Sequence, residues 1–201
     1  MTRLDQLIQT TKADAARFFE TFADDAPLIF EALLIAEDHR AERHHGIDWF
    51  SLLRALVLFP RTRKLRGVST IEQQYVRTVF KRRGSLIWCK LRELWLSWRL
   101  AGTLCKQEIW AAYLMRAYYG AHQIGYGAAR RSFCPQRKPL SIHAAAEITA
   151  CLKYPKPGQR NAQWRQAHQT RVQYILTRYA RLTSGAAKRP TSFPYLQNKP
   201  L

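Results

Sequence analysis

Apolar residues recur at three- and four-residue spacing through most of this chain, as in Leu91, Leu94, Trp95 and Trp98. This spacing places them on one face of a helix. The strict alternation that marks half-buried strands is scarce. The pattern therefore predicts a mainly α fold.

Turn and capping residues indicate where the helices begin and end. Pro27 can open a helix that runs to about Arg40. Ser69 and Glu72 form an S-x-x-E capping box for a helix that runs to about Phe80. We expect further helices at roughly 86–104, 106–119, 139–152 and 161–182, where glycines, prolines and caps separate the periodic segments.

The size of the chain suits a single domain. It has 201 residues, of which 47% are hydrophobic, and this is enough for one ordinary core. Residues 183–201 hold Pro, Gly, Ser and Lys without periodicity, a composition typical of a disordered tail. We therefore expect one domain over residues 1–182, followed by a disordered basic tail.

Charge is distributed very unevenly along the sequence. The chain carries 33 Lys and Arg against 14 Asp and Glu, a formal net charge of +19. Residues 1–48 have ten acids and five bases, whereas residues 49–201 have four acids and 28 bases. A protein so basic attracts polyanions, and an anionic membrane surface is the partner that we expect.

Glu93 is one of the few carboxylates in the basic region and is flanked by Lys90, Arg92 and Arg99. Nearby cations favour the ionised form of a carboxyl group, so we expect Glu93 to be charged at neutral pH. Lys90 and Glu93 are three residues apart, which puts them on one helix face. A structural salt bridge is the simplest interpretation of this pair.

The four cysteines include no C-x-x-C pair; they are Cys89, Cys105, Cys134 and Cys151. The common zinc sites and the thioredoxin-type redox motifs use such pairs, so neither is indicated. We expect four buried thiols and no metal site.

No stretch of the sequence has the features of an export signal or of a membrane span. Residues 1–25 lack the basic-then-apolar order of a signal peptide. The most apolar region, residues 85–105, is interrupted by charged residues that are costly in hydrocarbon. Any membrane contact is therefore expected to be peripheral.

A first cluster of polar residues runs from Glu37 to Asp48 and includes Asp38 and His44. Because Glu37 follows an apolar stretch, partial burial should raise its pKa toward that of a useful general base. Two other interpretations stay open. One is a solvated, charged helix end, and the other is metal binding, although no spacing here matches a common ligand motif.

A second cluster, residues 66–74, joins a glycine turn to the hydroxyls of Ser69 and Thr70 and the amides of Gln73 and Gln74. Helix N-termini attract phosphates and carboxylates. An ordinary capped helix would explain Ser69 but leaves the adjacent glutamines unexplained. We therefore expect the two amides to form hydrogen bonds with a ligand.

The order, residue types and spacing of these clusters resemble the bacterial peptidoglycan glycosyltransferases. That family includes the lysozyme-like domain of bifunctional penicillin-binding proteins and the monofunctional transglycosylases. The first family motif, E-D-x-x-F-x-x-H-x-G, is matched at Glu37, Asp38, His44 and Gly46, with Ala41 in place of phenylalanine. The second, G-x-S-T-I-x-Q-Q, is matched without a break over residues 67–74.

The later family motifs are matched in part. Lys90 and Glu93 fit the third, R-K-x-x-E, but Cys89 replaces its arginine, whose role Arg92 or Arg99 could take. The fourth, K-x-E-I-L-x-x-Y-L-N, is matched over residues 106–115 with changes at Trp110 and Met115, and Thr78 replaces a usual asparagine after the second motif. Segments over 126–133 and 140–155 also fit the family, so the resemblance covers roughly residues 28–160.

The resemblance implies an inverting glycosyltransferase that polymerises a lipid II-type disaccharide into glycan strands and releases a polyprenyl diphosphate. It implies that Glu37 is the general base and Glu93 a second essential carboxylate. Lys90, Arg92 and Lys153 would stabilise the diphosphate. The other substrate-binding residues that it implies are Asp38, His44, Ser69, Thr70, Gln73 and Gln74. No cofactor is obligatory in this scheme, although a divalent cation such as Mg²⁺ is an open alternative.

The family works on the outer face of the bacterial inner membrane, which implies peripheral attachment there and cell-wall synthesis proteins as further partners. A membrane-facing surface could come from Ile87, Trp88, Trp95, Trp98 and Trp110. Because these five share helical spacing with the leucines, we expect at least three of them in the core.

Three other functions stay open. The altered motif positions allow a catalytically weak member that binds cell-wall synthesis enzymes. The basic charge alone would suit nucleic-acid binding, but that function leaves Glu37 and Glu93 unexplained. A lysozyme-like fold could also hydrolyse glycan with Glu37 as the acid, but the diphosphate-binding cations would then have no role. We expect synthesis, without a nucleic-acid partner.

Overall fold

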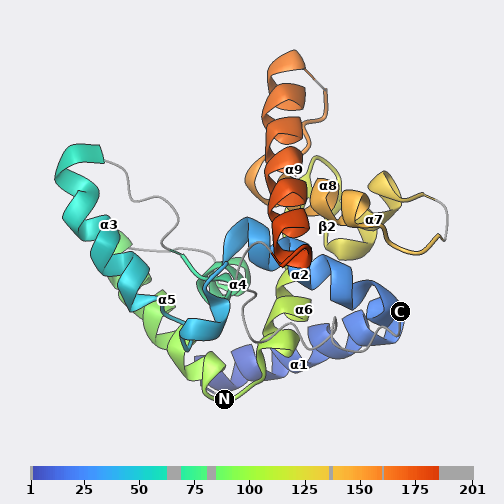
Figure 1. The fold of residues 1–201 in the computed structure, drawn as a ribbon. Coiled ribbons are helices and arrows are strands. Elements are labelled where there is room, and N and C mark those ends of the chain that lie inside the picture. Colours follow the sequence, from blue (N-terminus) through green and yellow to red (C-terminus); the bar gives the residue numbers. More distant parts are fainter. Residues whose placement is uncertain (1, 63–68, 81–84, 136–137, 160, 186–201) are drawn as a thin grey trace.

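The computed structural model describes residues 2–62, 69–80, 85–135, 138–159 and 161–185, without the side chains of residues 56 and 59–62. Most of these residues are helical, which confirms the predicted mainly α fold (Figure 1). The helices described are α1 (Arg3–Phe22), α2 (Ala26–Glu37), α3 (Trp49–Thr62), α4 (Ile71–Val79), α5 (Leu86–Ala101), α6 (Lys106–Arg116), α7 (Tyr126–Phe133), α8 (Ile142–Lys153) and α9 (Ala162–Thr183). Short 3₁₀ helices, η1 (Ala23–Asp25) and η2 (Ala41–Arg43), and an antiparallel pair, β1 (Tyr118–Gly120) and β2 (Gln123–Ile124), connect them.

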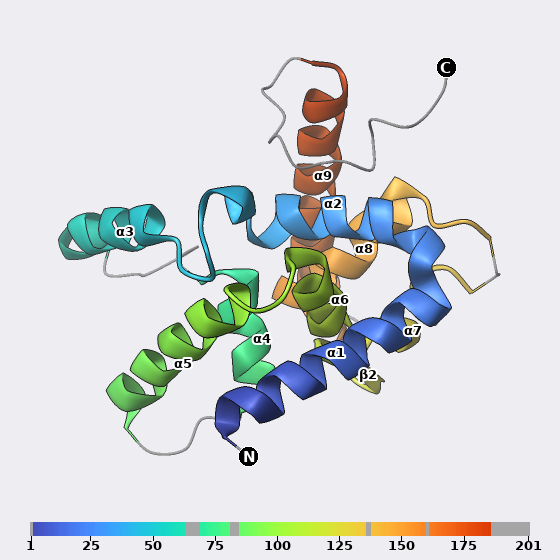
Figure 2. The same ribbon diagram turned by 90° about the horizontal axis from the view of Figure 1, so that it is seen from below.

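The helix α2 forms the centre of the core and is buried along most of its length. It packs against α6, α8 and α9, while α1 lies across α6 (Figure 2). Phe18 of α1 stacks on Phe30 of α2 with ring centroids 5.6 Å apart. Because α2 is covered by neighbours on several sides, its last residue, Glu37, is held in a defined place.

The helices predicted from sequence are present, with some of their ends shifted. α2 ends at Glu37 rather than near Arg40, because Asp38 leaves helical geometry at φ −152° and ψ 70°. Ser141 caps α8 by accepting the Ala144 N–H at 3.1 Å. Three helices were not expected from sequence: α1, α3 and α7.

The predicted capping box of Ser69 and Glu72 is wrong. Thr70 is the N-cap of α4, and its hydroxyl accepts the Gln73 N–H at 3.3 Å. Glu72 is fully buried, so its carboxylate does not return to the helix end. The helix therefore starts one residue later than the motif predicted, with Ile71 packed into the core.

The expectation that at least three of five apolar side chains pack in the core is also wrong. Trp110 is buried, but Ile87, Trp88, Trp95 and Trp98 are 51–73% exposed. α5 packs against α4 and α1 through one narrow face, so its aromatic face has no cover in the described part of the chain. In both views α3 and α5 point away from the body of the molecule on the same side (Figures 1 and 2).

The cysteines differ from one another in exposure. Cys89 and Cys151 are buried, whereas Cys134 is half-buried and Cys105 is exposed. The expectation of four buried thiols is therefore wrong, since Cys105 lies at the N-cap of α6 rather than within a helix.

Among the described helices, none is long and apolar enough to cross a bilayer. Two predictions fall on residues outside the described ranges: most of the expected tail, at 186–201, and the start of the second motif, at 66–68.

Candidate active site

Glu37 stands at the C-terminal end of α2 with 15% of its side chain exposed. The Gln74 amide donates to its Oε2 at 3.1 Å, and Arg171 Nη2 lies 3.4 Å from its Oε1. Burial raises the pKa of Glu37, although Gln74, Arg171 and Lys153 act in the opposite direction. The carboxylate is shielded but still reaches solvent, as the apolar stretch before it predicts.

Glu93 lies on α5 with only 4% of its side chain exposed. Arg77 donates to both of its oxygens at 3.1 and 3.0 Å, and Lys90 Nζ lies 2.6 Å from Oε1. Burial alone would raise the pKa of Glu93, but the hydrogen bonds from Arg77 and Lys90 outweigh it and lower the pKa. The predicted pair with Lys90 is confirmed, and the lowered pKa agrees with the expected charge.

The two glutamines of α4 connect these carboxylates. Gln74 accepts the Tyr113 hydroxyl at 2.8 Å while its amide group donates to Glu37. Gln73 accepts from Lys90 Nζ at 2.9 Å and donates to the Gly46 carbonyl at 3.3 Å. Both amides therefore have protein partners, and their presence does not require a ligand.

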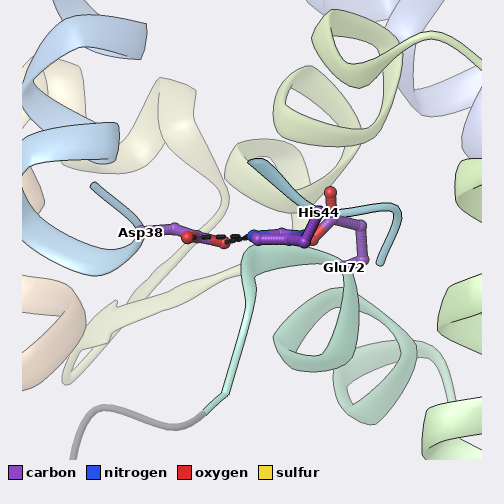
Figure 3. A group of neighbouring side chains, drawn as sticks. All are labelled: Asp38, His44 and Glu72. Carbon is purple, nitrogen blue, oxygen red and sulfur yellow. Dashed lines mark hydrogen bonds and ion pairs between the residues drawn. The ribbon is translucent and has the colours of Figure 1, made fainter. Parts of the chain in front are cut away.

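The loop after α2 is fixed from inside the protein. Both oxygens of Asp38 lie 3.1 Å from His44 Nε2, and the two side chains are buried (Figure 3). The Ile71 N–H donates to Asp38 at 3.3 Å, and the Thr70 hydroxyl donates to the Gly46 carbonyl at 2.8 Å. Asp38, His44 and Thr70 thus hold this loop against α4, while their contact with a substrate stays a prediction.

The remaining predicted residues divide between the two carboxylates. Lys153, at the end of α8, is close enough to Glu37 to act on its pKa. Ser69 accepts from Arg77 Nη2 at 3.3 Å and so belongs with Glu93. Arg92 is half-buried one residue before Glu93, and the described cations bonded to that carboxylate include Arg77 and Lys90.

Two arginines of the site were not identified from sequence. Arg77 is four residues after Gln73 on α4, a spacing that could have placed it on the same helix face. Arg77 supplies a cation beside Glu93, whereas Cys89, which replaces the arginine of the third family motif, has no charge to offer. Arg171 reaches Glu37 from α9, 134 residues along the chain, and no local pattern signals such a contact.

Two larger cavities lie near the small cleft that Glu37 lines, although Glu37 itself lines neither of them. Glu37, Ser69 and Thr70 line a small cleft. A cavity of about 700 Å³ between the end of α2 and α9 shares Asp38, His39 and Arg40 with that cleft. A second cavity, of about 460 Å³, is lined by Lys153 and Arg171. Cavities of several hundred Å³ are typical of ligand-binding sites.

A pair of carboxylates, one of them shielded from water, is the kind of arrangement that enzymes acting on glycosidic bonds use. The sequence profile of the transglycosylase family matches residues 5–180. The chain therefore belongs to the peptidoglycan transglycosylase family.

Its relatives include proteins of similar and of much greater length. The chain is 30% identical to a protein of Cupriavidus necator named as a transglycosylase, over 87% of this chain and 78% of that protein. It is 29% identical to penicillin-binding protein 1A of Rickettsia bellii and 34% identical to that of Escherichia coli, over 84% and 64% of this chain. These matches span 22% and 15% of the two penicillin-binding proteins.

Proposed function

We propose that this transglycosylase polymerises a lipid II-type disaccharide and that Glu37 is its general base. The observation that carries the proposal is the setting of Glu37: a helix-end carboxylate, 15% exposed, oriented by Gln74 and Arg171 at the edge of a cleft. A general base must be fixed in orientation and reachable by the hydroxyl that it deprotonates.

In the proposed step, the acceptor's 4-hydroxyl oxygen attacks the anomeric carbon of the donor and forms the new glycosidic bond. Its proton passes to Glu37. The bond from the anomeric carbon to the diphosphate breaks, and the electron pair leaves on the diphosphate oxygen. Attack opposite the leaving group inverts the anomeric centre.

Fixed cations would stabilise the departing diphosphate, because they need no reorganisation as its charge develops. Lys90 and Lys153 are the cations that we propose for this role, with Arg77 beside them. Glu93 is bonded to Arg77 and Lys90 and is almost fully buried, so we propose it as a positioning residue. With cations already in place, the transfer needs no obligatory cofactor.

A lipid-linked substrate also requires contact with a membrane. We propose that α3 and α5 provide it and attach the domain peripherally to the outer face of the bacterial inner membrane. Large apolar side chains are exposed along both helices, namely Trp49, Phe50, Leu53, Val57 and Leu58 on α3 and Leu86, Ile87, Trp88, Leu91, Trp95 and Trp98 on α5. Exposed patches of this kind mark protein or membrane contacts, and tryptophan is favoured at the bilayer interface.

The test of the proposed chemistry is polymerisation of labelled lipid-linked disaccharide-pentapeptide in detergent, with glycan products resolved by length. Glu37→Gln keeps the shape of the side chain and removes the base, so we expect turnover to fall about 10²–10⁴-fold. Glu147→Gln is the matched control, since Glu147 is a half-exposed carboxylate on α8 paired with His143. Equal polymerisation by wild type and Glu37→Gln would overturn the role of Glu37.

The same assay separates the other functions. Absence of polymer from the wild-type protein across pH and divalent ions would favour a non-catalytic partner of cell-wall enzymes. Shortening of added glycan strands would instead indicate hydrolysis.

A further inference from the structure

Three ligand-type side chains meet in the interior, away from solvent. Asp38 follows α2, His44 lies in the loop before α3, and Glu72 is in the first turn of α4. They are 7%, 5% and 0% exposed, and one potential ligand atom from each lies within 4.8 Å of the others. Figure 3 shows the His44 ring between the two carboxylates.

The hydrogen bonds in this cluster are incomplete. Neither oxygen of Glu72 accepts a hydrogen bond from a described residue, and His44 Nδ1 is likewise buried without a partner there. The nearest cation to Glu72 is Lys106, whose Nζ lies 3.9 Å from Oε1 and is already bonded to the carbonyls of Ala41 and His44. A buried carboxylate without hydrogen bonds is costly to keep ionised, and burial raises the pKa of Glu72 accordingly. Either a proton or a bound cation would neutralise it.

We propose that Asp38, His44 and Glu72 bind one divalent transition-metal ion of the Zn²⁺ class. Two carboxylates would neutralise the charge of such an ion. Ligand atoms at about 2.0–2.2 Å in a tetrahedral site lie roughly 3.3–3.6 Å apart, and His44 Nε2 is already 3.1 Å from Asp38. All three ligand atoms lie within 4.8 Å of one another, so Glu72 is the ligand that must move closer to complete the set around one ion.

The ligand set also selects among metals. One imidazole nitrogen with two carboxylate oxygens suits Zn²⁺ and Co²⁺. Mg²⁺ prefers oxygen ligands and usually keeps several waters, whereas one of the three ligands here is an imidazole nitrogen. Lys106 is the charged group that opposes binding, and its two carbonyl acceptors hold it at 3.9 Å from Glu72.

A bound ion would act as a structural clip. It would join the end of α2, the loop that follows it and the start of α4, the three segments that surround Glu37. From sequence, metal binding by this first cluster was only an open alternative, because no spacing there matches a common ligand motif. Here the ligands are 6 and 28 residues apart, and only the fold brings them together.

The test uses the purified full chain, freed of metal with a chelator. Titration with Co²⁺ should give ligand-field absorption that saturates at one ion per chain, and Zn²⁺ should displace it. The melting temperature should rise with Zn²⁺ concentration, because the ion binds the folded state alone. Mg²⁺ at the same concentration should leave it unchanged.

Glu72→Gln keeps the size of the side chain and should weaken Zn²⁺ binding at least tenfold. Glu147→Gln, which removes a carboxylate beside the exposed His143, should bind Zn²⁺ like the wild type. Circular dichroism of metal-free Glu72→Gln should show the same helix content as the metal-free wild type. No saturable Co²⁺ or Zn²⁺ binding by the wild type, or equal affinity in Glu72→Gln, would overturn the proposal. None of these readouts depends on glycosyl transfer.

Discussion

At the scale of single residues, Glu93 shows how charge pairing competes with burial. Its pKa is lowered in the folded protein, whereas in the unfolded chain it returns to its ordinary value near 4.5. As pH falls, Glu93 is protonated in the unfolded chain before it is protonated in the folded protein. The stability that its pairs with Arg77 and Lys90 provide is therefore fully present above the pKa of Glu93 in the unfolded chain. It is lost as the pH drops through the lower pKa of Glu93 in the folded protein.

We therefore expect the free energy of unfolding to fall between about pH 5 and the lowered pKa of Glu93, and this part of the slope to vanish in Glu93→Gln. Urea unfolding at a series of pH values measures it. An identical slope in wild type and Glu93→Gln would contradict the assignment.

At position 46, the backbone conformation and the space around Cα require glycine. Its φ is +77°, and an added Cβ would overlap the Ser97 carbonyl oxygen of α5. We expect Gly46→Ala to destabilise the fold by about 1–3 kcal/mol or more, from left-handed strain and this clash together. Gly185 has φ +73° and no described atom near the position of an added Cβ, so Gly185→Ala tests the backbone strain and should cost less in the same thermal melts.

At the scale of elements, α5 combines a buried face that includes Glu93 with an exposed aromatic face. Trp88 is 73% and Trp95 is 51% exposed, so replacing both with Gln should leave the melting temperature nearly unchanged. Burial of each large apolar side chain contributes about 1.5–3 kcal/mol. Binding to lipid vesicles should therefore drop by at least roughly tenfold, as flotation would measure.

The control for that experiment is Tyr118→Gln, because Tyr118 is 54% exposed on β1, outside α3 and α5. Equal loss of vesicle binding in this variant would argue against a specific surface on α5.

The periodicity of the sequence predicted where helices form better than it predicted whether the apolar face of each helix is buried or exposed. The pattern of Leu91, Leu94, Trp95 and Trp98 correctly predicted a helix, but an apolar stripe looks alike whether a core or a bilayer covers it. The capping box at Ser69 and Glu72 failed for a related reason. The sequence matches the local S-x-x-E motif, but the burial of Ile71 and Glu72 determines where the helix starts.

At the scale of the whole molecule, the net charge of +19 should make membrane binding depend on salt and lipid. Each basic residue near an anionic bilayer contributes about 1 kcal/mol, and the Debye length shortens from about 8 Å at 0.15 M to about 3 Å at 1 M salt. Binding to anionic vesicles should weaken steeply over this range, and binding to neutral vesicles much less.

Sedimentation of vesicles at several salt concentrations tests this expectation. Equal salt dependence on neutral and anionic vesicles would show that the positive charge has another target, and DNA of arbitrary sequence is the competitor to try next.

The candidate site could be predicted from sequence only where its residues are neighbours in the chain. Glu37, Gln74, Lys90 and Glu93 were identified because each lies in a short motif. Arg171 was not identified, because its partner Glu37 lies 134 residues away in the sequence. Nothing in the sequence around an arginine on a long helix indicates such a distant contact.

The distance between Arg171 and Glu37 along the chain also has a consequence in time. During synthesis at about 5–20 residues per second, roughly 7–27 s separate the emergence of the carboxylate from that of its guanidinium partner. Until α9 has left the ribosome and docked on α2, a nascent chain holds Glu37 without that partner. The site is therefore completed last, at the end of translation of the domain.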